Sequence, residues 1–89
     1  DTPIQYLYGR YFLPKQSGKL IEKEIDQVIY EKAYLYDLQF FKNIGDEVLA
    51  PLEGYDYIGW LTTKGKSYLE VEKSMNEALQ LVKYKIKPY

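Results

Sequence analysis

The sequence predicts an α+β domain, in which a small antiparallel β-sheet has one main amphipathic helix packed across it. The helix is indicated by Ser67 and Glu70, which form a capping box ahead of a run of spaced apolar residues. That run, with the i, i+4, i+7, i+11 spacing of a single helix face, consists of Val71, Met75, Ala78 and Val82. The sheet is indicated by short segments rich in Tyr, Leu and Phe between Gly and Pro turns. A chain of 89 residues makes one domain with a modest core.

The first half of the chain begins with two predicted strands. Residues 4–13 are rich in Tyr, Leu and Phe, and Pro14 ends this segment before a turn at residues 15–18. Residues 19–25 suit a second, half-buried strand, so we expect the two segments to pair as a β-hairpin. Residues 26–33 fit either a continuation of the strand or one or two helical turns. We favour the helical turns, because the side chain of Asp26 can cap them.

The middle of the chain predicts two further strands. Residues 34–41 alternate with period two, which places Tyr36, Leu38 and Phe40 on a buried side. A turn at residues 43–46 needs a positive φ at Gly45, and a short extended piece follows at residues 48–51. Residues 51–56 break both periods and are expected to form an exposed loop. The first half of residues 58–63 is apolar, which favours a strand in the centre of the sheet.

The last third of the chain contains the helix and a final strand. About 16 residues at 1.5 Å each give a helix of roughly 24 Å, long enough to cross a small sheet. Tyr84 and Ile86 then alternate with lysines, which is typical of an edge strand, and Pro88 ends it.

Composition narrows the possible partners. The 12 basic and 13 acidic residues are spread along the chain, so nucleic-acid binding is not expected. No apolar run approaches the ~20 residues of a membrane span. The chain has neither Cys nor His, which removes disulfides and the commonest general base and suits a reducing cytoplasm. The start at Asp1, Thr2 and Pro3 is typical of a fragment boundary.

Three cations are candidates for contact with a substrate or a phosphate group. Arg10 is the only arginine in the chain, and a guanidinium can bind carboxylate or phosphate through two parallel hydrogen bonds. A structural salt bridge is the alternative. Lys64 and Lys66 flank Gly65 just before the predicted helix, whose start can receive an anion. One glycine without a further glycine-rich loop is more typical of a tight strand-to-helix turn.

The acidic residues do not form a diagnostic catalytic pair, and we expect no catalytic or metal-binding residue here. They lie on exposed strand faces and in turns, as Glu22, Glu24, Asp37, Asp46, Glu47, Glu53 and Asp56. The many aromatic residues lack interleaved basic residues, so they predict packing within the fold and not a platform for stacking bases.

Several segments together resemble the small C-terminal domain of ATP-grasp ligases, the family of biotin carboxylase, carbamoyl-phosphate synthetase and the amino-acid ligases. The resemblance spans residues 7–86. It rests on Phe12-Leu13-Pro14 with Ser17-Gly18-Lys19, on Gly45-Asp46-Glu47-Val48, and on Tyr57-Ile58-Gly59-Trp60-Leu61 with the segment that follows. Such domains are antiparallel sheets with a helix on one face. The Arg-Ile-Asn-Ala-Glu motif of biotin carboxylase is missing, which disfavours biotin as the substrate.

The resemblance implies that the chain is the C-terminal subdomain of a larger ligase. That enzyme would use ATP and Mg²⁺ and capture an acyl phosphate with an amine. Its ATP and Mg²⁺ would be held by an upstream ATP-grasp core of the same polypeptide, with no cofactor bound by these residues. We expect the helix to lie over the strand that contains Phe12, and the resemblance to depend on pairing of the Phe12 and Lys19 arms.

Two other functions remain open from the sequence. Gly45-Asp46-Glu47-Val48 followed by Gly54 is similar to the turns of lipoyl and biotinyl carrier domains, which would make Lys64 or Lys66 the modified lysine. Such carriers lack a long C-terminal helix. The third alternative is a free-standing protein-interaction module.

Overall fold

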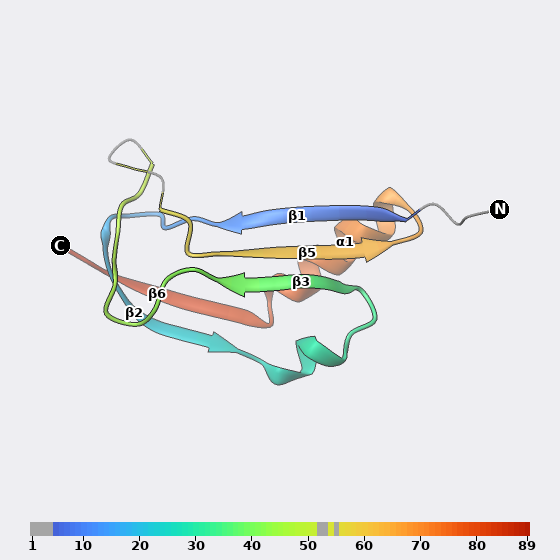
Figure 1. Cartoon of the computed structure of the whole chain (residues 1–89), viewed down its shortest axis with the longest axis horizontal. Coiled ribbons are helices and arrows are strands. Elements are labelled where there is room, and N and C mark those ends of the chain that lie inside the picture. The colour runs from blue at the N-terminus through green and yellow to red at the C-terminus, as the bar shows by residue number, and fades with distance from the viewer. Residues whose placement is uncertain (1–4, 52–53, 55) are drawn as a thin grey trace.

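The computed structural model describes residues 5–51, 54 and 56–89 and confirms the α+β class (Figure 1). Within this described part of the chain, no helix is both long and apolar enough to cross a membrane. The elements run in the order β1 (Tyr6–Phe12), β2 (Gly18–Ile25), the 3₁₀ helix η1 (Gln27–Glu31), β3 (Leu35–Phe40), β4 (Glu47–Val48), β5 (Gly59–Gly65), α1 (Tyr68–Leu79) and β6 (Val82–Pro88).

The strands form two three-stranded sheets, and every pairing in them is antiparallel. Sheet A has the order β1-β5-β3, so the prediction that the strand after residue 58 is central is confirmed. Sheet B has the order β4-β2-β6, with β6 at an edge as predicted. The helix packs on sheet A, where it contacts β5 and β1, and this expectation is also confirmed.

The predicted hairpin between the first two strands is wrong. Strand β1 pairs with β5 in sheet A, whereas β2 lies in the middle of sheet B, with β4 along one edge and β6 along the other. Both edges of β2 are therefore used. Two local features direct the chain there. The Ser17 hydroxyl accepts a hydrogen bond from the Ala50 N–H at 2.8 Å, and Gly18 lies so close to the Lys87 carbonyl that a Cβ would come within 2.1 Å of its oxygen.

The short helix after β2 is confirmed, and the strand that follows it needs one correction. The Asp26 carboxylate accepts a hydrogen bond from the Val28 N–H at 3.1 Å and so caps η1. In β3, Leu38 and Phe40 pack against the core as predicted. Tyr36 does not, and 56% of its surface is exposed. A register shift between Leu35 and Asp37 is the reason, because one extra residue in a strand reverses the alternation of its side chains.

The turn before β4 is confirmed, with Gly45 at φ 100°. The loop beyond β4 is described only in part, since Glu53 and Tyr55 lie outside the described residues, as do Asp1, Thr2, Pro3 and the first residue of the strand predicted at residues 4–13. The described side chain of Asp56 accepts a hydrogen bond from the Leu49 N–H at 2.7 Å and holds the end of the loop to its start.

The helix begins as the sequence predicts. The Ser67 hydroxyl accepts from the Glu70 N–H at 3.1 Å, and the Glu70 carboxylate accepts from the Lys66 N–H at 2.9 Å. It has 12 residues instead of about 16, because the chain turns at Gln80 and Val82 becomes the first residue of β6. Val82 is nevertheless buried beside the helix residues of the predicted stripe.

One core lies between the inner face of sheet A and the elements that cover it. The helix covers one end, where the Thr63 hydroxyl donates to the Val71 carbonyl at 2.9 Å. Sheet B covers the other end, where the Phe12 ring lies 5.7 Å from Phe40 and 5.8 Å from Tyr84. The buried core residues are Phe12, Leu20, Ile29, Val48, Ile58, Leu61, Met75, Ala78 and Val82.

Candidate functional site

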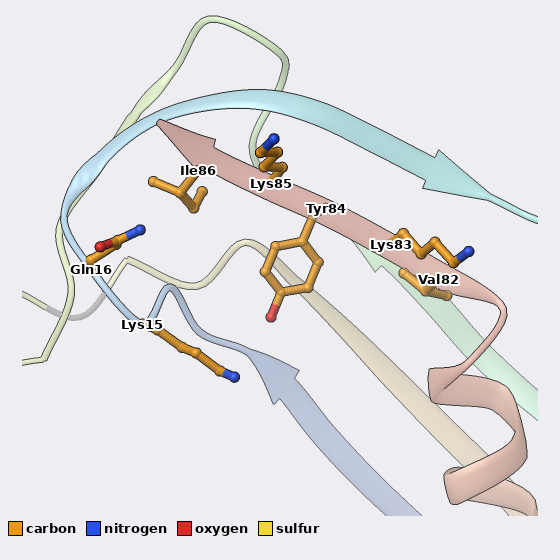
Figure 2. Close-up of a pocket in the computed structure, with 7 residues that line it drawn as sticks. All are labelled: Lys15, Gln16, Val82, Lys83, Tyr84, Lys85 and Ile86. Atoms are coloured by element: carbon orange, nitrogen blue, oxygen red, sulfur yellow. The ribbon is translucent and has the colours of Figure 1, made fainter. Parts of the chain in front are cut away.

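Two hollows of the described surface adjoin each other beside β6 and the linker that follows β1. One has a volume of about 480 Å³ and includes Lys15, Tyr84 and Ile86 in its lining (Figure 2). The other, of about 360 Å³, brings in Arg10 from β1. The two share Lys15, Val82 and Tyr84, so we treat them as one groove and call it the Arg10 groove.

Tyr84 stands in the middle of this groove. Its ring projects from β6 toward the linker, and its hydroxyl donates a hydrogen bond to the Leu13 carbonyl at 3.3 Å (Figure 2). Burial raises the pKa of the Tyr84 hydroxyl, and the nearby positive charge of Arg10 acts in the opposite direction. The phenol is therefore neutral at physiological pH and serves as a hydrogen-bonding group, not as a base.

Two cations of the groove, Arg10 and Lys15, have no ion-pair partner among the described residues. Across residues 5–51, 54 and 56–89, the ion pairs join Lys32 to Glu77 and Lys42 to Asp56, and neither includes Arg10 or Lys15. The alternative of a structural salt bridge at Arg10 therefore finds no support in the described residues. Arg10 is exposed at the edge strand of sheet A, where its guanidinium can bind an anion.

The structure does not bring Lys64 and Lys66 to this groove. In the antiparallel register Arg10 lies opposite Leu61 and Lys64 lies opposite Leu7, three residues farther along β5, or about 10 Å at the rise of a strand. Side chains alternate along a strand, so Arg10 shares the inner face with Leu61 while Lys64 is on the outer face. Arg10 and Lys64 therefore cannot hold the same chemical group.

The two lysines instead line a separate hollow of about 270 Å³ together with Glu70 and Tyr34. The Glu70 carboxylate lies at this point and accepts from the Lys66 N–H. Burial raises the pKa of Tyr34, and the Glu77 carboxylate raises it further. Two carboxylates near the hollow weaken its attraction for phosphate. Lys64 is also inside a strand and not at a hairpin tip, unlike the modified lysine of a carrier domain.

The candidate carboxylates have structural partners or lie dispersed. Asp37 accepts from the Gln39 side chain at 3.1 Å, and Asp46 accepts from the Asn43 N–H at 2.7 Å. Glu22 and Glu24 are exposed on β2, opposite Lys85 and Lys83. Among the described residues, no group of three or more acidic side chains could hold a metal ion. Glu53 lies outside those residues.

Sequence reasoning identified Arg10 but missed its neighbours in the groove. Lys15 appeared only as a turn residue, and Tyr84 only as part of an alternating edge strand. Tyr84 and Leu13 are 71 residues apart, and their contact depends on β6 lying beside the linker. No local pattern in a single sequence carries that information.

Comparison with known proteins agrees with this architecture. A family model described as "L-amino acid ligase C-terminal domain 2" matches residues 10–87. Among solved structures, the fold is similar to the crystal structure of L-amino acid ligase from Bacillus licheniformis, with a TM-score of 0.72 and 16% sequence identity. The match covers 91% of this chain and 20% of that chain, so this chain spans about one fifth of the length of that ligase. No curated protein matched.

The resemblance to ATP-grasp ligases is thus confirmed at the level of the domain. The family match covers well over half of the chain and includes Arg10, the β2 strand, the helix and most of β6. The chain belongs to the L-amino acid ligase C-terminal domain 2 family, within the ATP-grasp L-amino acid ligases.

Proposed function

We propose that this chain is the C-terminal subdomain of an ATP-dependent carboxylate–amine ligase that joins amino acids. It packs against an upstream ATP-grasp core of the same cytoplasmic polypeptide and covers the active site without catalysing the reaction alone. The match of the family model to residues 10–87 carries this proposal. Of the enzyme groups in the resemblance, it favours amino-acid ligases over biotin carboxylase and carbamoyl-phosphate synthetase.

The described residues of this domain do not fit a Mg²⁺ site. Mg²⁺ needs carboxylates that converge on one point, and the described acidic residues do not converge. We therefore assign Mg²⁺ and ATP to the upstream core and derive no step through them here. The contribution of this domain is to enclose the reacting groups, because excluding water protects an activated carboxyl group from hydrolysis.

Arg10 is our candidate for direct contact with the substrate. It is exposed, has no acidic partner among the described residues, and stands beside Lys15 and the Tyr84 hydroxyl. A guanidinium in this setting can orient a carboxylate or phosphate group through paired hydrogen bonds. Lys64 and Lys66 are the second candidate, in the separate hollow beside the start of α1, where they would contact a different group.

The activity is tested on the full-length polypeptide that contains these residues. We expect ADP release that requires an amino-acid acceptor and donor, together with a ligated product of the expected mass. ADP release that does not depend on amino acids, or no release with any amino-acid pair, would contradict the proposal.

The Arg10 assignment is tested in the same enzyme with matched variants. A hydrogen bond to a charged group contributes about 1.5–3 kcal/mol, so Arg10→Ala should lower kcat/KM for the amino acid about tenfold or more. Arg10→Lys should recover part of the loss, because the charge remains but the paired geometry does not. Lys73→Ala, at an exposed position of α1, is the control, and we expect a change of less than about twofold, typical of a solvent-exposed charge. Equal losses in Arg10→Ala and Lys73→Ala would contradict the assignment.

A further inference from the structure

Sheet A has a second face that points away from the core. The helix and sheet B lie on its inner side, with Leu61, Thr63 and Phe12. On the outer side, Tyr11 lies opposite Trp60, and Trp60 lies opposite Gln39 on the other neighbouring strand. The ring centroids of Tyr11 and Tyr57 are 4.1 Å apart, and those of Tyr11 and Trp60 are 4.4 Å apart. We call Tyr11, Tyr57 and Trp60 the aromatic face.

A glycine makes this face flat. A Cβ built on Gly9 would come within 2.2 Å of the Trp60 ring, so the indole lies directly on the backbone of β1. The ring is thereby held against the sheet by both Gly9 and Tyr11. Flat aromatic side chains with few rotatable bonds lose little conformational entropy when another surface covers them.

The aromatic face has the composition of an interface centre. Tyr11 is 46% exposed and Tyr57 is 41% exposed, so this stacked pair is accessible to a partner surface. Within sheet A, the charged residues whose register places them on the outer side are Asp37, on an edge strand, and Lys64, near the end of β5, so charge lies to the side of the aromatic face. Protein interfaces concentrate Tyr and Trp at the centre and leave charges at the rim.

We propose that the aromatic face docks against an upstream domain of the same polypeptide. This inference rests on the proposed function, in which these residues are one part of a ligase. The ligase of similar structure is about five times longer than the matched segment, so most of such a chain is available to cover this face. On this proposal the preceding polypeptide enters through β1, the strand that carries Gly9 and Tyr11.

The covalent link also favours this occupant over a second copy. A tethered domain meets the face at a high effective concentration, so a surface of modest size is enough to keep it docked. Strand β1 is an edge strand, and Arg10 and Tyr11 are neighbours on it. A domain that covers the aromatic face and reaches around this edge would therefore also meet the Arg10 groove.

Hydroxyl-radical labelling of the full-length ligase, read by mass spectrometry, tests the docking. Tyr30 and Tyr68 are 53% and 63% exposed, and they serve as internal references on other surfaces. If a domain covers the aromatic face, the exposed Tyr11 and Tyr57 should be labelled several-fold more slowly than the references, because an interface centre excludes water. Labelling at the rate of Tyr68 would overturn the proposal.

A charge variant and a dilution series complete the test. Tyr11→Lys places a charge in the centre of the face and should raise the labelling of Tyr57 to the rate of Tyr68, whereas Tyr68→Lys should not. Protection that disappears on dilution would show a second copy as the occupant and overturn the proposal. Amino-acid-dependent ADP release is measured on the same samples. Protection without ligase activity would leave the docking intact and refute the proposed function. Ligase activity without protection would support the proposed function and overturn the docking.

Discussion

The two sheets share one core but have different outer faces. On sheet B, Glu22 lies opposite Lys85 and Glu24 opposite Lys83, so opposite charges alternate over an exposed surface. On the outer face of sheet A, Tyr11 lies opposite Trp60, and contacts between aromatic rings replace the charges. The printed sequence already differs, because β6 alternates lysines with Tyr and Ile while β5 contains Trp, Leu and Thr in succession.

The difference shows that different physical requirements determine the residues of the inner faces and those of the outer faces. Both inner faces must fill the same core, so both carry Leu, Ile, Val or Phe. An outer face in water is best covered by charges, which also keep exposed sheet edges from pairing with other chains. Stacked rings on an outer face add only about 0.5–1.5 kcal/mol each beyond their burial. Their presence on the outer face of sheet A is therefore better explained by a covering partner than by their contribution to stability.

The largest effect is expected from a substitution that separates the strands of sheet B. In Gly18→Ala, the new methyl group would lie 2.1 Å from the Lys87 carbonyl oxygen, and a backbone atom cannot rotate away. Overpacking of this kind costs about 2–3 kcal/mol, which should appear as a lower midpoint of urea unfolding. A midpoint equal to that of the parent protein would show that β2 and β6 are not so tightly paired.

The corresponding substitution in sheet A should act on the aromatic face instead. In Gly9→Ala the methyl group meets the far end of the Trp60 ring, a side chain that can move aside. We expect a smaller loss, of about 1–2 kcal/mol, together with a red shift of Trp60 emission as the ring leaves the sheet. Trp60 is the only tryptophan of the 89 residues, so the emission of this segment reports on it alone. Unchanged emission would contradict the placement of the ring on Gly9.

The packing of α1 on the inner side of sheet A can be weakened without changing the aromatic face. Ser67→Ala removes the hydroxyl that accepts from the Glu70 N–H and should cost about 1 kcal/mol of unfolding free energy. Because α1 contacts the inner face only, Trp60 emission should not change. Ser74→Ala, later in the same helix, is the control that keeps the cap. A shift of Trp60 emission in Ser67→Ala would show that the two faces are coupled.

The inner side of sheet B should respond to alkaline pH through Tyr84. Burial raises the folded-state pKa of its hydroxyl above the ordinary value of 10.0. Above pH 10.0 the unfolded chain releases this proton while the folded protein keeps it, so stability falls as pH rises toward the folded-state pKa. Tyr84→Phe removes the hydrogen bond to the Leu13 carbonyl and should lower the free energy of unfolding by about 0.5–1 kcal/mol at neutral pH. Between pH 9 and 11, the urea midpoint of this variant should fall less than that of the parent protein. An equal fall in both proteins would contradict the role assigned to burial.

The sequence predicted local features of the fold well and long-range pairings poorly. The capping box at Ser67, the cap at Asp26 and the turn at Gly45 follow from residues within a few positions of each other, and all are confirmed. The hairpin was wrong because the partners of β2 come from β4 and β6, far along the chain. The expected dependence of the family resemblance on that hairpin was also wrong, since the family model matches while the two arms lie in different sheets.

The candidate site shows the same limit. Arg10 could be chosen from its chemistry alone, as the single arginine of the chain. Its separation from Lys64 needed the antiparallel register, which sets the face on which each side chain lies. The aromatic face could not be identified either, because Tyr and Trp in a strand predict core packing as readily as an uncovered surface. Only the position of the helix on the other side of sheet A distinguishes the two.

The smallest effect on stability is expected from the charges on sheet B. The dependence of this effect on salt concentration should distinguish the outer face of sheet B from that of sheet A. Glu24→Lys places a lysine directly opposite Lys83, so an attractive cross-strand pair becomes a repulsive one. The exposed position limits the loss to about 0.5 kcal/mol at low ionic strength, and salt should reduce it further, since the Debye length falls to about 3 Å at 1 M. Glu24→Gln, which removes the attraction without adding repulsion, should lie between the variant and the parent protein. Gly9→Ala, whose effect is steric, should lose the same stability at every salt concentration. If the loss in Glu24→Lys does not depend on salt, then this face is not an ordinary solvated surface, and the contrast with the aromatic face fails.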